Sequence, residues 1–261
     1  MGALDLTLKQ VAAFVEERRR DGGQVRAFPC SGDPQELRQG LPVRVGPGAN
    51  AGLILRPDTF AELGSPDAGS AAFPVWTRDA SLLSDGRITL IGPRIRESEG
   101  ASLPFGQVLM IGGAELGDEE HEALEQNQYV ADQIEGYMIR STPGRMWSRV
   151  GKDAARRGFD FDVLGQALMV LFKSAIPKIE AMEVLFVTSG KEDLQQLNGI
   201  AEQVRTIGTL IARNAWLARG YDILECTLGV DCRSCSDKPT CDDIRDVVKI
   251  RKKKLRKPAD A

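Results

Sequence analysis

The sequence is poor in several features that would point to a common class of function. It has a single histidine, His121, so no histidine-based catalytic triad can be argued. It has no apolar run of about 18 residues, so no membrane-spanning helix is expected. The glycine-rich segment VGPGANAG at 45–52 lacks the lysine and hydroxyl of a P-loop, and it is interpreted as a loop.

The chain also has little net charge, and no secretory signal is expected from its first residues. Its net charge is −3 over 261 residues, so no global field attracts nucleic acid or a membrane surface. The N-terminus, MGALDLTLKQ, carries an early acidic residue and no apolar segment, which argues against a secretory signal. A cytoplasmic location is therefore expected, with neither a membrane nor a nucleic acid as partner.

Short apolar runs and amphipathic stretches alternate along the chain, without a strict strand–helix–strand repeat. This predicts an α/β or α+β fold with a mixed sheet and flanking helices. Residues 21–50, rich in Gly and Pro, predict a loop, and STPGR at 141–145 predicts a linker. The predicted strands are 51–56, 71–78, 87–92, 105–113 and 181–189, and the predicted helices are 7–20, 118–139, 162–175 and 192–219.

Four of the five cysteines are concentrated near the C-terminus. Cys226, Cys232, Cys235 and Cys241 form the pattern C-x5-C-x2-C-x5-C, whereas Cys30 stands alone and is interpreted as an ordinary thiol. In a reducing compartment such a cluster indicates a metal site before it indicates disulfides. Four thiolates suit either a tetrahedral zinc or a four-iron cluster, and the spacing alone does not decide between them.

This distribution divides the chain into three predicted parts. Residues 1–40 form an N-terminal helix and loop, and residues 41–220 form the central domain. Residues 221–261 form a small cysteine-rich metal module that ends in a basic tail, KIRKKKLRK at 249–257.

A second candidate site is a basic stretch around Trp147. Several cations so close together suit an anion with several phosphates, because arginine pairs well with phosphate oxygens. Trp147 could then stack on an adenine. The alternative is a solvated basic surface, with Trp147 in the core and Arg149 and Lys152 on one exposed helix face. The cations are Arg140, Arg145, Arg149, Lys152, Arg156 and Arg157.

Residues from about 41 to 188 resemble the central domain of acetyl-CoA synthase, the beta subunit of the carbon monoxide dehydrogenase/acetyl-CoA synthase complex. The similar segments are LPVRVGP at 41–47, SLLSDGRITLIGPRI at 81–95, LPFGQVLMIGG at 103–113 and WSRVGKDAARRGFDF at 147–161. In the last segment the residues in family positions are Trp147, Arg149, Val150, Lys152, Asp153, Ala154, Gly158 and Phe159. The resemblance makes 41–220 an acetyl-CoA-synthase-like domain.

The resemblance implies a metal centre and a coenzyme A site, but the sequence departs from the family's pattern at several positions. The family enzyme joins a methyl group, carbon monoxide and coenzyme A at a nickel–iron–sulfur centre. Cys232 and Cys235 fall where the family's cluster segment would begin, but the other spacings differ and no Cys-Gly-Cys element for nickel is present. The family's large N-terminal domain has no counterpart in the sequence, and a second tryptophan of the central domain is Met138 here.

The resemblance therefore favours a [4Fe-4S] cluster over zinc, and coenzyme A as the anion. The expected function is an iron–sulfur-binding redox or scaffold component of anaerobic one-carbon metabolism, acting with carbon monoxide dehydrogenase or other pathway subunits. One alternative is a zinc-stapled, non-catalytic interaction protein. The other is a genuine CO-methylating acetyl-CoA synthase component, an acyltransferase that would require nickel.

Overall fold

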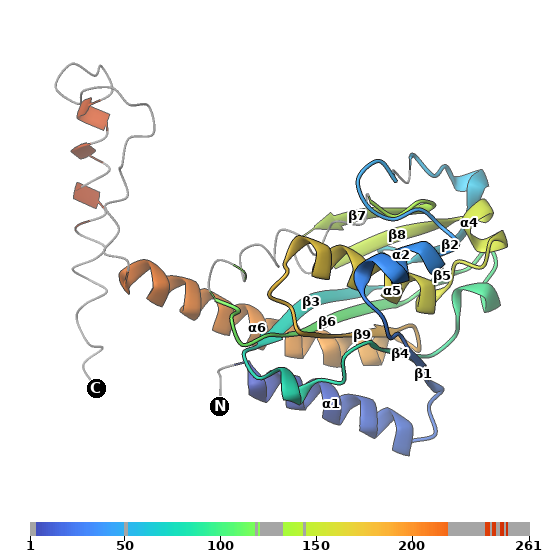
Figure 1. The fold of residues 1–261 in the computed structure, drawn as a ribbon, viewed down its shortest axis with the longest axis horizontal. Helices are drawn as coiled ribbons and strands as arrows, with labels where there is room; N and C mark the ends of the chain where they lie inside the picture. Colours follow the sequence, from blue (N-terminus) through green and yellow to red (C-terminus); the bar gives the residue numbers. More distant parts are fainter. Residues whose placement is uncertain are drawn as a thin grey trace. The chain divides into compact units, whose positions relative to one another are not determined.

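The structure is a computed structural model. It describes residues 4–49, 52–117, 120, 133–142 and 145–218, and near the C-terminus 238–240, 242–243, 246–247 and 249. The chain divides into two compact units, Met1–Gly208 and Thr209–Ala261. The first unit contains both sheets and is shown in Figure 1. In the second unit, the described residues from 238 onward are helical.

The larger sheet has five strands in the order β1-β4-β9-β6-β3. The β4–β9 and β6–β3 pairs are parallel, whereas the β1–β4 and β9–β6 pairs are antiparallel. The inner strands are continuous apolar runs because both of their faces are covered. The strands are β1 (Val25–Pro29), β3 (Ser70–Thr77), β4 (Arg87–Ile91), β6 (Phe105–Gly112) and β9 (Ala181–Val187).

The smaller sheet has four strands in the order β5-β2-β8-β7. Along β8 (Arg145–Gly151), Met146, Ser148 and Val150 are buried, whereas the residues between them are more exposed. This alternation places the basic residues of β8 on the outer face of the sheet. The other strands are β2 (Thr59–Leu63), β5 (Ser102–Leu103) and β7 (Tyr137–Thr142).

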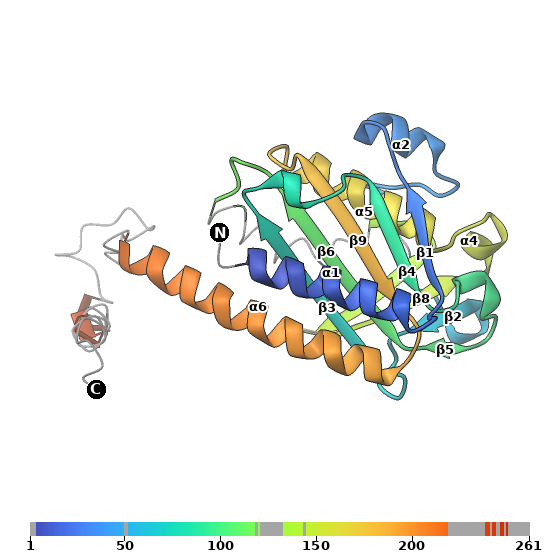
Figure 2. The same ribbon diagram turned by 90° about the horizontal axis from the view of Figure 1, so that it is seen from below.

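Helices cover both faces of the larger sheet. Helix α1 (Asp5–Arg20) and the part of α6 (Lys191–Ala218) that belongs to the first unit lie side by side across one face (Figure 2). Helix α5 (Phe161–Ala175) lies between the two sheets, with α2 (Pro34–Gly40) beside it (Figure 1). Short helical segments complete the fold: α4 (Lys152–Arg156), η1 (Arg56–Asp58), η2 (Ala80–Leu82) and η3 (Ile95–Glu97).

The core is aromatic where α5 meets the larger sheet. Phe161 of α5 packs against Phe105 of β6 and Phe186 of β9, with ring centroids 6.1 and 5.0 Å apart. On the opposite face, a Cβ at Gly106 would lie 2.8 Å from the Leu197 side chain, so glycine there lets α6 approach the sheet closely. No helix among the described residues is long and apolar enough to cross a membrane.

These elements confirm the predicted mixed α/β fold with flanking helices. The predicted helices near 7–20, 162–175 and 192–219 are present, as are four of the five predicted strands, 71–78, 87–92, 105–113 and 181–189. The four-cysteine part of the prediction lies outside the described residues.

Four local predictions were wrong. Residues 21–50 contain β1 and α2 as well as loop, and the described part of 51–56 is irregular up to η1 rather than a strand. The predicted helix 118–139 does not reach its end, because Tyr137 begins β7. The predicted linker 141–145 instead joins β7 to β8, whose antiparallel register pairs Thr142 with Arg145. Cross-strand pairing between β7 and β8 thus determines the structure here.

A candidate anion-binding pocket

The β7–β8 hairpin brings three of the predicted site residues onto one face. Arg140 lies directly opposite Trp147 in the register, and Thr142 lies opposite Arg145. Opposed residues of an antiparallel pair share a face, and residues two apart along a strand share it too. Arg140, Arg145 and Trp147 therefore belong to one cluster, with the two arginines on a diagonal.

This cluster forms one wall of a pocket of about 510 Å³, referred to below as the cationic pocket. The second wall is the first turns of α6. The third is the loop between β2 and β3. The lining residues are Gly64, Ser65, Pro66, Asp67, Gly69 and Ser70 of the loop, Arg140, Arg145 and Trp147 of the hairpin, and Lys191, Leu194, Gln195 and Asn198 of α6.

Hydrogen bonds fix the loop against the two other walls. Ser70 Oγ accepts a bond of 3.1 Å from the backbone N–H of Met146, and Ser70 O accepts one of 3.3 Å from Asn198 Nδ2. At Gly64, where φ is +71°, a Cβ would lie 2.2 Å from the Met146 carbonyl oxygen. Only glycine fits this conformation and this close approach, so the loop and β8 are held in contact.

The charges lining the cationic pocket are mostly positive. Among the described residues, none of Arg140, Arg145 and Lys191 has a salt bridge to a carboxylate. Of the lining residues that the structure describes, Asp67 alone is acidic. Three cations thus face one carboxylate in a concave site, an arrangement that attracts anions.

The ring of Trp147 already has cationic neighbours. The guanidinium carbons of Arg140 and Arg149 lie 5.5 and 5.1 Å from its centroid, within the range of cation–π contacts. Its Nε1 is buried and has no hydrogen-bond partner among the described residues. The indole therefore holds two arginines in place beside the pocket.

The remaining cations of the basic stretch lie outside the pocket lining. Arg149 Nε pairs with Glu62 at 2.8 Å, and its Nη1 donates to the Ile54 carbonyl at 3.2 Å. Arg149 lies on β8, so the helix face that it was predicted to share with Lys152 does not exist. Lys152 and Arg156 belong to α4, and Arg156 pairs with Asp153 at 3.0 Å.

Arg157 contributes to a second, shallower basic groove of about 430 Å³ that also contains Arg38 and Arg44. Glu135 also lines the groove and forms ion pairs with Arg44 at 3.2 Å and with Arg157 at 3.1 Å. The backbone N–H of Arg44, and then the guanidinium of Arg157, lower the pKa of Glu135 to about 2. The groove thus carries its own anion, which makes it less suited to an external one.

Comparison with known proteins decides the family. A model of the CO dehydrogenase/acetyl-CoA synthase complex beta subunit family matches residues 41–193, more than half of the chain. The chain belongs to this family. It is 30% identical over 168 residues to an acetyl-CoA decarbonylase/synthase complex subunit beta 1 of Methanosarcina thermophila. The aligned region covers 63% of this chain and 35% of that relative.

Other relatives give the same result. A subunit beta 2 of Methanosarcina acetivorans is 32% identical over 161 residues, covering 60% of this chain and 34% of the relative. A subunit beta of Methanothermobacter thermautotrophicus is 31% identical over 150 residues, covering 57% and 32%. The matched part of the chain thus spans about a third of the length of these relatives. The family match contains the loop, the hairpin and Lys191, whereas Leu194, Gln195 and Asn198 follow it.

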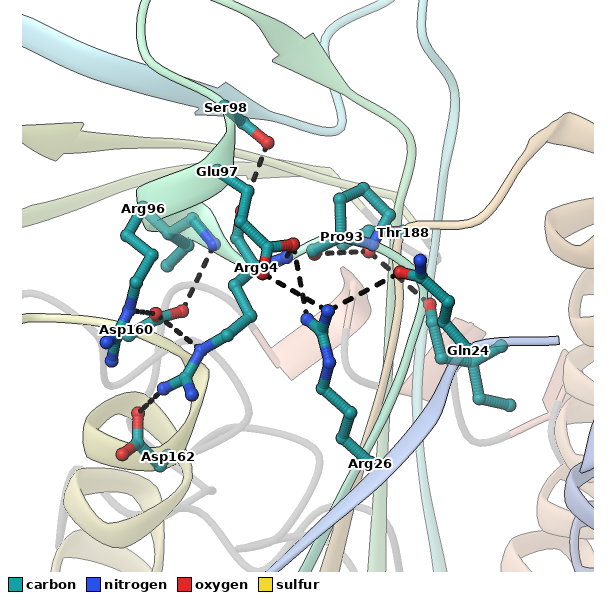
Figure 3. Close-up of polar contacts among 12 residues, drawn as sticks. Gln24, Arg26, Pro93, Arg94, Arg96, Glu97, Ser98, Asp160, Asp162 and Thr188 are labelled. Carbon is teal, nitrogen blue, oxygen red and sulfur yellow. Dashed lines mark hydrogen bonds and ion pairs between the residues drawn. The ribbon is translucent and has the colours of Figure 1, made fainter.

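Two of the family-like segments are joined by a network of ion pairs around the buried carboxylate of Asp160 (Figure 3). Asp160, at the N-terminus of α5, accepts bonds of 2.7 Å from Arg94 Nε and 2.6 Å from Arg96 Nε, as well as from the backbone N–H groups of Ile95 and Phe161. The hydrogen bond to Asp160 raises the pKa of Arg96. These contacts connect the segment after β4, including η3, to α5 and indicate a structural role for both segments.

The predicted metal ligands cannot be placed in this geometry. Cys226, Cys232, Cys235 and Cys241 lie outside the described residues, as does His121. Within the described ranges, no group of three or more His, Cys, Asp or Glu side chains is arranged to hold a metal ion. Cys30 is described and buried, and burial raises the pKa of its thiol.

Sequence reasoning missed the loop and α6 walls of the pocket. Lys191 was not a candidate, because it lies far from the basic stretch in the chain. The loop sequence GSPDAGS at 64–70 did carry a signal, since two glycines flank a serine and an aspartate. Both glycines have positive φ, +71° at Gly64 and +88° at Gly69, which is typical of a tightly shaped loop.

Proposed function

We propose that this chain binds coenzyme A in the cationic pocket and acts as an iron–sulfur-containing redox or scaffold component of anaerobic acetyl-CoA metabolism. The observation that carries the proposal is the gathering of Arg140, Arg145 and Lys191 around one pocket, unpaired with any described carboxylate. The family to which the chain belongs supports acetyl-CoA chemistry as the context.

Coenzyme A suits the chemistry of the pocket walls. Its diphosphate requires cations, and the guanidinium groups of Arg140 and Arg145, which lie on one face of the hairpin, can bind its oxygens in pairs. Its uncharged arm carries amides, which match the side-chain amides of Gln195 and Asn198 beside the apolar side chain of Leu194. The pocket volume also lies within the range of small-molecule sites.

Titration calorimetry of the full-length protein with coenzyme A tests the binding. Arg145→Ala is expected to weaken binding about tenfold, the loss of one charge-assisted phosphate contact, about 1.4 kcal/mol. The matched control is Arg20→Ala, an exposed arginine at the end of α1 that lines no described pocket. An Arg145→Ala variant that binds as tightly as the control would reject the pocket as the coenzyme A site.

The metal part of the proposal rests on the spacing of the four cysteines together with the family. Protein purified without oxygen should be brown and contain on the order of four iron atoms per chain with sulfide. A Cys232→Ser variant should lose them, because the thiolates are the ligands. A colourless protein with about one zinc ion per chain would instead favour the alternative function, a zinc-stapled, non-catalytic interaction protein. Bound nickel would point to a CO-methylating acetyl-CoA synthase component.

The partner part of the proposal follows from the names of the relatives, which are subunits of acetyl-CoA decarbonylase/synthase complexes. We expect the chain to associate with carbon monoxide dehydrogenase or with another one-carbon pathway subunit. Affinity purification of the tagged chain from its own cells, without oxygen, tests this. Recovery of the chain with no such subunit would argue against a role within a complex.

A further inference from the structure

Helix α6 presents one line of side chains to the cationic pocket. Leu194 and Gln195 follow Lys191 by three and four residues, and Asn198 follows Gln195 by three, which places all four on one helix face. Lys191 begins the helix, and Asn198 follows seven residues later, about 10 Å further along the axis. The two ends of this line therefore lie against different parts of the pocket.

The Asn198 end is fixed beside the arginines. Asn198 donates to the carbonyl of Ser70, and the hydroxyl of the same Ser70 accepts the backbone N–H of Met146, the residue after Arg145. Lys191 is at the opposite end of the line, near Leu194, whose side chain would lie 3.5 Å from a Cβ at Gly69. The pocket thus has two separate centres of positive charge, the diagonal pair Arg140 and Arg145 on the hairpin and Lys191 on α6.

Two separated cationic centres fit a ligand with two separated anionic groups. The paired guanidinium groups suit a diphosphate, which offers several oxygens in a row. A lysine ammonium is a compact point charge that suits a single phosphate monoester. Asp67 also lines the pocket, and its negative charge disfavours a phosphate that is not held by its own cation.

We propose that Lys191 determines specificity for a second phosphate, separate from the diphosphate, on the ligand of the cationic pocket. For coenzyme A this group is the phosphate monoester on its ribose. The inference rests on the proposed function, since it assigns one part of that ligand to one residue. Lys191 is exposed and pairs with no described carboxylate, so its ammonium group is available to the ligand.

The test compares coenzyme A with dephospho-coenzyme A, which lacks only the ribose phosphate. Titration calorimetry of the full-length protein should give about tenfold tighter binding of coenzyme A. In Lys191→Gln, coenzyme A should bind about tenfold more weakly, whereas dephospho-coenzyme A should bind as before. The ratio of the two dissociation constants should therefore fall to about one, and circular dichroism should show an unchanged fold.

Two variants make the result specific. Arg20→Gln removes an exposed charge elsewhere and should leave the tenfold ratio intact. Arg145→Ala should weaken both ligands and also leave the ratio intact, because both keep the diphosphate. A Lys191→Gln variant that still discriminates tenfold would overturn the inference while the proposed function stands. If wild-type protein bound neither ligand, the proposed function and the inference would both fall.

Discussion

The Nε atom of Arg94 donates a hydrogen bond of 2.7 Å to the carboxylate of Asp160, whose side chain is only 1% exposed. Arg94 also reaches Asp162 at 3.0 Å and lies over the ring of Phe28, 4.9 Å from its centroid. One largely covered arginine thus joins the segment between β4 and η3 to the first turn of α5 and the edge strand β1. The stability of the larger sheet should depend on this contact.

Asp160→Asn should therefore destabilise the fold strongly. The variant keeps an acceptor for the backbone N–H groups but leaves the Arg94 guanidinium without its buried counter-charge. We expect the free energy of unfolding to fall by about 3–5 kcal/mol, as is typical when one partner of a buried ion pair is removed. Urea denaturation followed by circular dichroism measures the change.

The control for this prediction is Arg96→Gln. Arg96 binds the same carboxylate at 2.6 Å, but its own side chain is 59% exposed. Solvent screens such a charge, so the loss should stay within about 1 kcal/mol. Equal losses in the two variants would contradict the role assigned to burial.

Arg149 is expected to stabilise the smaller sheet rather than to bind the ligand. Its guanidinium pairs with Glu62 across the β2–β8 register and covers the ring of Trp147. Arg149→Ala should lower the free energy of unfolding by about 2 kcal/mol, through lost packing as well as lost charge. Coenzyme A binding should change less than twofold.

A double-mutant cycle with Glu62→Gln isolates the ion pair. Partners in direct contact should show a coupling free energy of about 1 kcal/mol in denaturation experiments. Additive effects would show that Arg149 acts through its contacts with Trp147 and the Ile54 carbonyl rather than through Glu62. If Arg149→Ala strongly weakened coenzyme A binding and left the stability unchanged, Arg149 would instead be a ligand-binding residue.

The low pKa of Glu135 predicts a dependence of stability on pH. The pKa is about 2 in the folded protein, below the ordinary value of 4.5. The ionised carboxylate therefore stabilises the folded state fully above about pH 4.5, and this contribution is lost as the pH falls towards 2. Glu135→Gln removes it at every pH.

Urea denaturation over this pH range should thus show a steeper loss of stability in the wild-type protein than in Glu135→Gln. The control is Glu36→Gln, an exposed residue of α2, whose curve should run parallel to that of the wild-type protein. Other acidic groups, such as Glu97, titrate in all three proteins and cancel in the comparison. Parallel curves for Glu135→Gln and wild type would contradict the assigned pKa.

The elements that the sequence predicted correctly are those with an unambiguous apolar pattern. Strands β4, β6 and β9 are continuous apolar runs, and α5 is apolar around most of its surface, so burial alone identifies them. Strand β7 was missed because Tyr137 and Met138 follow an acidic stretch that suggests a helix. Its conformation comes from pairing with β8, a contact that no local pattern contains.

In the candidate site, too, the sequence predicted the local features but not those that depend on tertiary contacts. Arg140, Arg145 and Trp147 are near one another in the sequence, so the sequence alone indicates that they cluster. It does not indicate which arginines are neutralised, because Glu62 lies 87 residues before Arg149. Lys191 reaches the pocket only through the packing of α6 on the larger sheet. Tertiary contacts, rather than composition, separate the cations facing the pocket from those that hold the fold.

Gly64 provides a test of how the loop shapes the cationic pocket. Its φ of +71° resembles the +75° of Gly100, so alanine at either position meets similar backbone strain, about 1–2 kcal/mol. A Cβ at Gly100 would meet open space, whereas one at Gly64 would lie 2.2 Å from the Met146 carbonyl and 2.9 Å from Ser70 Cβ. Only Gly64→Ala must therefore separate the loop from β8.

We expect Gly64→Ala to lower the free energy of unfolding by about 2 kcal/mol more than Gly100→Ala, in line with the penalty for overpacking. It should also weaken coenzyme A binding, because Met146 adjoins Arg145 and any shift of β8 moves that guanidinium away from α6. Gly100→Ala should bind coenzyme A as the wild-type protein does. If both variants lost stability equally and bound equally well, the close contact between the loop and the hairpin would have no part in shaping the site.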